Sequence, residues 1–126
     1  MVQEFNSSRP IYLQLADRII QRIIRGELQP GDKLPSVRET AVDSGVNPNT
    51  VQRTYSELER MDVSVTKRGQ GTFVTENSEV LKEIRNKLKS EHIEAFIDDM
   101  EAIGFTEKEI IDGLSEEFSK RKGEES

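Results

Sequence analysis

Five polar side chains close together in the sequence are of the kinds that read the edges of DNA bases. Asparagine and glutamine can each pair with adenine through two hydrogen bonds, and arginine can pair in the same way with guanine. A capped and solvated helix end has a similar composition, so the spacing alone favours the two interpretations about equally. The five residues are Asn47, Asn49, Thr50, Gln52 and Arg53.

A second chemical signal is a short basic segment rich in glycine. Lys67 and Arg68 are followed by Gly69, Gln70 and Gly71. Positive charge beside glycine lets a backbone approach a phosphate or a minor groove closely. This segment therefore favours the base-reading interpretation of the first group.

Helical signals predict the elements that position the first group. Helical apolar spacing begins after Pro10 and stops near Gly26. Ser36 opens a capping-box pattern that predicts a short second helix ending near Gly45. Asn47 followed by proline is typical of a helix start, so the five polar residues lie at the beginning of a third helix.

After the third helix the apolar period changes from helical to alternating. Residues 63–67 alternate with β-branched side chains and predict a strand, and residues 72–75 predict its return after the glycine-rich turn. The expected fold is therefore mainly α with a small β-hairpin. Its second and third helices form a helix-turn-helix, with the hairpin as a wing.

The remainder of the chain predicts two more helices. We expect a long helix from Ser78 to Ile103, ended by Gly104, and a last helix opened by the capping-box pattern at Thr106. The tail from Lys120 to Ser126 contains no apolar residue, which favours disorder. We expect a first domain over residues 1–76 and a second over residues 77–126.

The net negative charge of the chain comes entirely from the second domain. Residues 1–76 carry ten basic and ten acidic side chains, whereas the last fifty residues account for the whole net charge of −6. A polyanion is therefore expected to meet the first domain only.

Several separated blocks, in order, resemble the GntR family of bacterial transcription regulators. Pro10-Ile11-Tyr12 is the first block, and the others span residues 26–39, 46–51 and 66–74. The resemblance covers residues 9–76 and is specific because the blocks occur in sequence. It implies a winged helix-turn-helix that binds double-stranded DNA as a homodimer. The short helical C-terminal part resembles the YtrA-type subfamily, in which two helices serve mainly for dimerisation.

The resemblance also assigns residues to the DNA, position by position. Ser36 and Arg38 lie at the start of the second helix, where Arg38 would contact a phosphate or a base. The recognition helix and the wing supply the other expected contacts: Asn47, Asn49, Thr50, Gln52, Arg53, Lys67, Arg68, Gly69 and Gln70.

Three residues depart from the family pattern. Pro48 replaces a basic residue found in other branches, so that contact is absent. Asp62 replaces the usual glycine between recognition helix and wing, and Ser64 replaces an apolar residue. Aspartate can adopt a left-handed conformation at some cost, so we expect a locally altered entry to the wing.

Apolar side chains at helical spacing predict the dimerisation surface. A lone pair of helices would leave them exposed, and a second copy related by a two-fold axis would bury them. An effector, if one binds, would meet this interface near Phe96, Met100 and Phe118, although an ordinary dimer core is favoured. The dimerisation residues are Leu81, Ile84, Leu88, Ile93, Phe96, Ile97, Met100, Ile103, Ile110, Leu114 and Phe118.

Three weaker patterns have simpler explanations. Arg18, Arg22 and Arg25 form a stripe that is better explained as a solvated helix face. His92 has no carboxylate three or four residues away in the sequence, which argues against a metal pair. The adjacent pair Asp98-Asp99 points in two directions on a helix and is expected to be acidic surface.

Composition excludes several functional classes. The chain has no cysteine and one histidine, no nucleophile–base pair and no phosphate-binding loop, so we expect neither an enzyme nor a cofactor or metal. No apolar run is long enough to cross a membrane, and a cytoplasmic protein is expected. The sequence favours a homodimeric DNA-binding regulator, a repressor on a palindromic operator. The alternative is a winged-helix module that binds protein.

Overall fold

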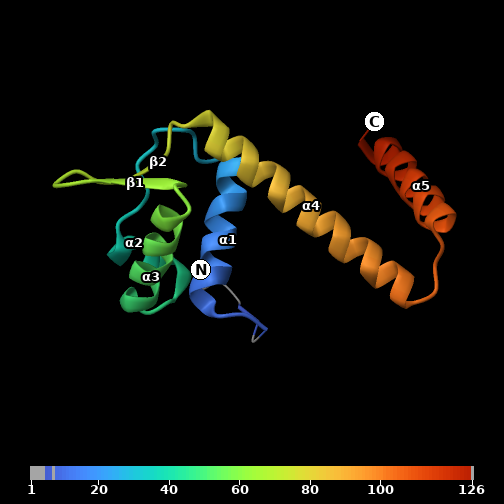
Figure 1. Cartoon of the computed structure of the whole chain (residues 1–126), viewed down its shortest axis with the longest axis horizontal. Coiled ribbons are helices and arrows are strands. Elements are labelled where there is room, and N and C mark those ends of the chain that lie inside the picture. Colours follow the sequence, from blue (N-terminus) through green and yellow to red (C-terminus); the bar gives the residue numbers. More distant parts are fainter. Residues whose placement is uncertain (1–4, 7, 126) are drawn as a thin grey trace. The chain divides into compact units, whose positions relative to one another are not determined.

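The computed structural model describes residues 5–6 and 8–125, which contain five helices and a two-stranded antiparallel sheet (Figure 1). These elements belong to two compact units, the first ending at Arg85 and the second beginning at Asn86. Helix α4 (Ser78–Ala102) contributes residues to both units. The functional boundary between residues 76 and 77 remains a prediction.

Helix α1 (Ile11–Ile24) provides the apolar face on which the first unit is built. It begins at Pro10, whose carbonyl accepts hydrogen bonds from the amides of Leu13 and Gln14 at 3.1 and 3.2 Å. After the helix, Gly26 adopts φ +86°, a conformation that favours glycine. The buried apolar residues recur at helical spacing, as predicted: Leu15, Ala16, Ile19, Ile20 and Ile23.

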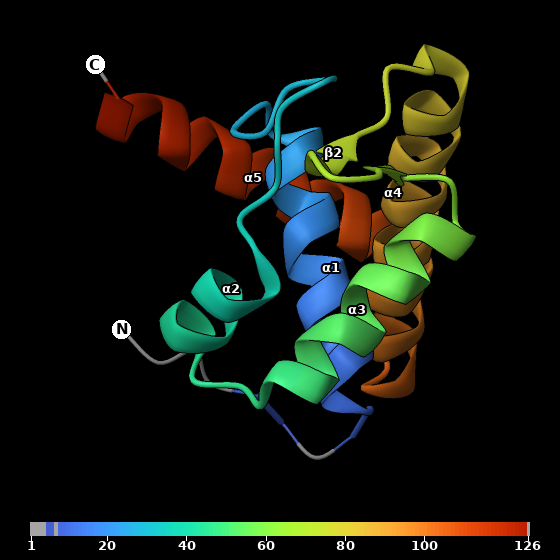
Figure 2. The same ribbon diagram turned by 90° about the vertical axis from the view of Figure 1, so that its left-hand side faces the viewer.

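Helices α2 (Val37–Ser44) and α3 (Pro48–Arg60) form the helix-turn-helix. The turn begins at Gly45, which takes the left-handed conformation at φ +69°. Val51, Tyr55 and Leu58 are buried on α3. Figure 2 shows α2, α3 and the hairpin on the side facing the viewer, with α1 behind α3.

The wing consists of strands β1 (Ser64–Lys67) and β2 (Gly71–Val74). They pair with Ser64 opposite Val74 and Lys67 opposite Gly71. The turn between them closes with a 2.9 Å hydrogen bond from the Gln70 amide to the Lys67 carbonyl. The hairpin is thus confirmed, with each strand within one residue of its predicted limits.

The entry to the wing shifts the side-chain alternation by one residue. Asp62 adopts φ +63°, the left-handed conformation expected of it. Val63 lies in this turn and is buried, and the first strand residue, Ser64, is buried as well. As a result, Val65 points outward and is 46% exposed. The alternation within β1 therefore places serine, not valine, on the inner face.

A third extended segment, absent from the sequence-based expectation, pairs with the free edge of β2. The amides of Gly31 and Leu34 donate to the carbonyls of Val74 and Thr72 at 2.9 and 2.8 Å. The Val74 amide donates in return to the Asp32 carbonyl at 2.8 Å. These bonds fix the wing to the loop that precedes α2.

The helices of the C-terminal part begin and end at identifiable caps. Helix α4 begins at Ser78, as predicted, and Asn77 caps it: the Asn77 side-chain oxygen accepts from the amides of Glu79 and Val80 at 3.1 and 3.4 Å. Asparagine provides a carbonyl acceptor here, one residue before the serine. Gly104 follows α4 with φ +97°, and α5 (Glu107–Glu125) then begins.

The end of the chain differs from the expected disordered tail. Helix α5 continues to Glu125. Arg121 and Glu117 lie one turn apart and form an ion pair at 3.0 Å. This contact stabilises the last part of α5, which has no apolar residue. An exposed pair of this kind stabilises a helix by about 0.2–0.5 kcal/mol.

Residues 5–6 and 8–125 lack two kinds of feature. No helix in this part of the chain combines the length and apolar character needed to cross a membrane. The same residues contain no group of three histidine or acidic side chains positioned to hold a metal ion.

Candidate nucleic-acid interface

The first turn of α3 presents hydrogen-bonding side chains to solvent. Asn47 caps the helix by accepting a 2.8 Å bond from the Asn49 amide, and Pro48 occupies the first helical position. Proline costs nothing there because the amide of that position has no helical partner. Asn49, Gln52 and Arg53 are exposed and available to a ligand.

Capping restricts what Asn47 can offer to DNA. Its side-chain oxygen accepts from the Asn49 amide and is therefore directed at the backbone of its own helix, whereas the cap does not use the side-chain amide nitrogen. A two-bond pairing with adenine needs both ends of the side chain. Asn47 is therefore suited to donate to a phosphate or to a single base acceptor.

A fully buried threonine fixes α3 against α1. The Thr54 hydroxyl donates to the Tyr12 carbonyl at 2.9 Å and lies 3.1 Å from the Thr50 carbonyl. Its residue is 0% exposed. Thr50 itself is half-buried, so it presents less surface than the other candidates of this helix.

The start of α2 is held by a complete capping box. The Ser36 hydroxyl accepts from the Glu39 amide at 3.1 Å, and the Glu39 carboxylate accepts from the Ser36 amide at 3.0 Å. The bonds from Ser36 hold the pKa of Glu39 below its usual value. Arg38 is exposed in this first turn.

Tyr55 ties the start of α2 to α3. Its hydroxyl donates to the Pro35 carbonyl at 2.6 Å and lies 2.7 Å from the Thr40 hydroxyl. Burial raises the pKa of Tyr55, so the phenol stays protonated and can donate. Tyr55 thereby fixes the candidate DNA contacts at the start of α2 relative to those at the start of α3.

The wing tip carries the predicted basic residues. Lys67, Arg68, Gly69 and Gln70 are all exposed. Gly69 adopts φ +78°, and a Cβ added to it would meet no atom within 4 Å, so its backbone is open to approach. The Lys67 ammonium lies 4.6 Å from the centre of the Phe73 ring, which steadies the side chain.

Lys33 was not predicted to belong to this face. An open groove between the wing and the segment before α2 is lined by Lys33, Ser36, Lys67 and Arg68, among others. The Lys33 side chain crosses the start of β2, where a Cβ on Gly71 would lie 2.7 Å from its Cε. The pairing that brings it there joins residues 33 and 73, a separation that no local pattern encodes.

The structure thus places the eleven DNA-contact candidates on the start of α2, the start of α3 and the wing. These three elements belong to the first unit and share the face that Figure 2 presents. Whether each side chain touches DNA remains a prediction.

The arginine stripe of α1 has partners within the chain. Arg25 and Arg22 lie 3.0 and 3.4 Å from the Glu27 carboxylate, and the pKa of Glu27 is lowered by them, chiefly by Arg25. Arg18 stacks on the Phe5 ring at 4.0 Å. These contacts agree with a solvated helix face.

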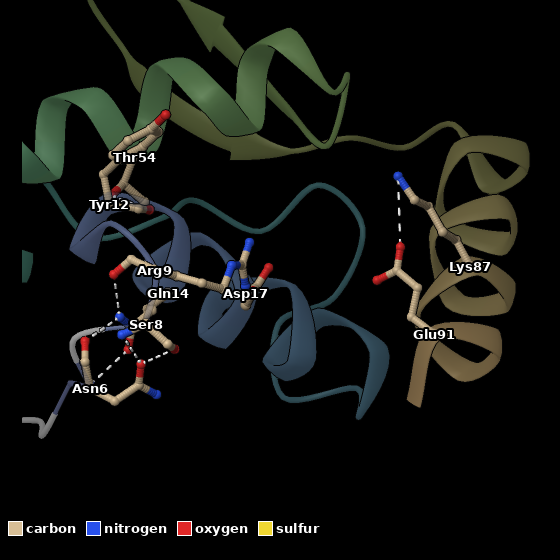
Figure 3. A network of polar contacts seen from close by, with 9 residues as sticks. All are labelled: Asn6, Ser8, Arg9, Tyr12, Gln14, Asp17, Thr54, Lys87 and Glu91. Atoms are coloured by element: carbon tan, nitrogen blue, oxygen red, sulfur yellow. Dashed lines mark hydrogen bonds and ion pairs between the residues drawn. The ribbon is translucent and has the colours of Figure 1, made fainter. Parts of the chain in front are cut away.

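A polar network fastens the segment before α1 to that helix (Figure 3). The Gln14 side chain accepts from the Asn6 amide at 3.1 Å and donates to the carbonyls of Asn6 and Arg9 at 2.7 Å. Arg9 also forms an ion pair with Asp17. The network fixes the first turn of α1, which carries Tyr12.

The residues predicted for dimerisation fall into three groups by exposure. Ile110 is buried within the second unit. Leu81, Ile84, Leu88 and Met100 are half-buried. The others are exposed: Ile93, Phe96, Ile97, Ile103, Leu114 and Phe118.

Part of the exposed group lines an apolar groove within the second unit. Ile93, Phe96 and Ile97 of α4 face Ile111 and Leu114 of α5 across it. His92, Asp98 and Asp99 are exposed on α4, in agreement with an acidic surface. The second unit therefore combines a charged exterior with an unburied apolar surface.

Comparison of the sequence with known proteins identifies one family to which this chain is similar. Residues 11–74 match the family described as bacterial regulatory proteins, gntR family. The uncharacterised HTH-type transcriptional regulator YhcF of Bacillus subtilis is 53% identical over 114 residues, which cover 90% of this chain and 94% of that protein.

Two further relatives extend the similarity over both units. The HTH-type transcriptional repressor YtrA of B. subtilis is 37% identical over 118 residues, 93% of this chain and 91% of that protein. A GntR family transcriptional regulator from Listeria monocytogenes has a similar structure, with a TM-score of 0.82 and 38% identity. The alignment covers 89% of this chain and 98% of that one.

Proposed function

The chain belongs to the gntR family of bacterial regulatory proteins, and on this premise we propose that it is a homodimeric repressor of a palindromic operator. Membership makes it a DNA-binding transcription regulator of the YtrA type and not an enzyme. The operator symmetry, the dimer and the sign of regulation are the proposed part.

The arrangement of three elements on one face carries the proposal. Base-reading side chains occupy the exposed start of α3, and cations occupy the wing beside it. A recognition helix in the major groove with a basic wing on the flanking backbone uses both kinds of group. Asn49, Gln52 and Arg53 are the proposed base contacts.

Charge balance favours a dimer as the binding species. The first 76 residues have no net charge, so general attraction to the phosphate backbone is weak for one copy. Two copies double the number of protein–DNA contacts and use the same side chains in each half-site. Successive major grooves on one face of DNA lie about 34 Å apart, which sets the expected spacing of half-sites.

The exposed apolar residues of the second unit support dimerisation. Ile93 is 49% exposed and Phe118 is 60% exposed. A soluble monomer seldom exposes a continuous apolar surface of this kind, whereas a second copy would cover it. We therefore propose residues 77–126 as the dimerisation domain and residues 1–76 as the DNA-binding domain.

Repression is proposed from one relative. YtrA of B. subtilis is named a repressor, and it aligns with this chain over both units. A dimer of this protein bound at a promoter would likewise repress transcription. A regulator of this kind acts in the cytoplasm, where the bacterial chromosome is.

DNase I footprinting on the DNA upstream of the protein's own gene tests the proposal. We expect one protected region with two-fold symmetry, and sedimentation equilibrium should give twice the chain mass of 14.4 kDa. Protection without symmetry, or a monomer at micromolar concentration, would contradict the homodimer. Absence of protection together with capture of a protein partner would favour the protein-binding alternative.

A further inference from the structure

The Arg53 side chain of the recognition helix α3 stacks on the aromatic ring of Tyr12, a residue of another helix. Its guanidinium carbon lies 4.0 Å from the centre of the Tyr12 ring. Tyr12 belongs to the first turn of α1 and is half-buried, whereas Arg53 is exposed on α3. A cation over a tyrosine face at this distance is a favourable interaction.

Tyr12 is itself fixed relative to α3. Its carbonyl accepts the 2.9 Å hydrogen bond from Thr54, the residue that follows Arg53 (Figure 3). Thr54 is completely buried, so this bond is shielded from water. The backbone of Tyr12 is therefore fixed next to the α3 residues that adjoin Arg53, within reach of the stacking contact.

Stacking leaves the hydrogen-bonding edge of Arg53 unused. The guanidinium donors lie in the plane of the group, while the ring covers its face. In the part of the chain that the structure describes, Glu57 is the acidic residue one turn along α3, and Arg60 already holds it at 3.0 Å. That ion pair lowers the pKa of Glu57. Because Glu57 pairs with Arg60, the Arg53 guanidinium is not drawn into an ion pair with Glu57.

We propose that Tyr12 is a positioning residue for Arg53, which it holds with its donor edge turned toward the DNA. The proposal rests on the function proposed above and adds to it a residue outside the helix-turn-helix and the wing. Binding then immobilises a side chain that is already ordered, which lowers the entropic cost of recognition. The tyrosine ring, and not its hydroxyl, is the required group.

A double-mutant cycle tests this coupling. Affinity is measured by fluorescence anisotropy on a duplex containing the footprinted operator, for Tyr12→Leu, Arg53→Ala and the double variant. Tyr12→Leu should weaken binding about two- to fivefold, the range that an exposed cation–π contact represents. In the Arg53→Ala background the same change should have no further effect. An equal loss in both backgrounds would overturn the proposal.

Tyr12→Phe is the matched control because it retains the ring. It should bind as the wild type does, and a loss as large as that of Tyr12→Leu would contradict the role of the ring. Thermal unfolding of each variant checks that α1 still packs on α3. A variant that unfolds is replaced by Tyr12→Met, which keeps the bulk without the aromatic face.

A measurement without DNA separates this proposal from the proposed function. In the free protein, the Tyr12 ring should shift the Arg53 side-chain proton resonances upfield in NMR spectra. Tyr12→Phe should preserve the shift and Tyr12→Leu should abolish it. An unshifted wild-type resonance would overturn the stacking itself. Failure of the wild type to prefer its operator would instead count against the proposed function.

Discussion

At the residue scale, Arg53 and Lys67 carry the same charge but are expected to meet different parts of the DNA. Arg53→Ala should weaken operator binding by about 1–3 kcal/mol and relax the choice of base, because arginine reads guanine through two hydrogen bonds. Titrations of operator and scrambled duplexes measure both effects.

Lys67→Ala is the comparison for Arg53→Ala. It removes a phosphate contact, so it should weaken binding to operator and scrambled DNA alike and reduce the salt slope by about one. Identical losses on both duplexes for both variants would contradict the division of roles.

Lys33 provides a prediction that follows from the structure and not from the sequence. Lys33→Met keeps an unbranched chain over Gly71 and removes the charge. Affinity for all duplexes should fall, with a salt slope reduced by about 0.9 if one phosphate contact is lost.

The matched control for Lys33→Met is Lys82→Met, which alters an exposed lysine of α4. It should bind as the wild type does. Equal effects of the two variants would place Lys33 outside the interface.

Local patterns predicted the exposed residues of α3 and the wing tip, because caps and glycine turns are encoded by neighbours. They did not predict Lys33, whose position depends on pairing with Phe73 across the sheet. They also did not predict that the oxygen of Asn47 is engaged by its own helix.

At the scale of elements, the inner face of the wing contains an unsatisfied hydroxyl. Ser64 is 3% exposed, and its Oγ has no hydrogen-bond partner among the residues that the structure describes. Ser64→Ala should raise the free energy of unfolding by about 1 kcal/mol, because it removes the desolvation cost of a buried polar group. Urea denaturation measures the change. A lower stability would show that the hydroxyl has a partner.

The capping box of α2 predicts a dependence on pH. The pKa of Glu39 is lowered in the fold, so its contribution to stability is fully present above the pKa of the unfolded state and is lost as the pH falls through the folded-state pKa. Glu39→Gln does not titrate. Its stability should therefore fall less than that of the wild type between pH 5 and pH 3 in urea titrations. Parallel losses would contradict this source of acid sensitivity.

Most element limits followed from caps and periodicity, including Pro48 at the start of α3 and the capping box of α2. The start of α4 at Ser78 was predicted correctly, but its cap was not identified, because Asn77 and Ser78 are both capping types and geometry decides between them. The sequence also missed the inward position of Ser64, since the turn at Asp62 shifts the strand phase.

At the scale of the whole molecule, the apolar surface of the second unit is expected to join two copies. Ile97→Glu places a charge on the groove-lining face of α4 and should weaken the dimer by roughly tenfold or more, because a buried unpaired charge is costly. Sedimentation equilibrium measures the dissociation constant.

Ala95→Glu is the control for Ile97→Glu, since it adds the same charge at an exposed position of the same helix. It should leave the dimer intact. A dimer unaffected by Ile97→Glu, with α4 still folded by circular dichroism, would contradict this interface.

The sequence predicted a surface for dimerisation because apolar residues recur at helical spacing where a two-helix segment cannot bury them. It did not separate Ile110, which packs inside the unit, from the exposed residues around it. That distinction depends on how α5 folds back, which the spacing alone leaves undetermined.

Sequence-specific binding by two copies is the central claim, and fluorescence anisotropy on the protein's own upstream DNA tests it most directly. A scrambled duplex of equal length is titrated in parallel over a range of salt concentrations. We predict tight binding of two protomers to the upstream DNA and weak, strongly salt-dependent binding to the scrambled duplex. Equally weak binding to both duplexes would contradict the claim.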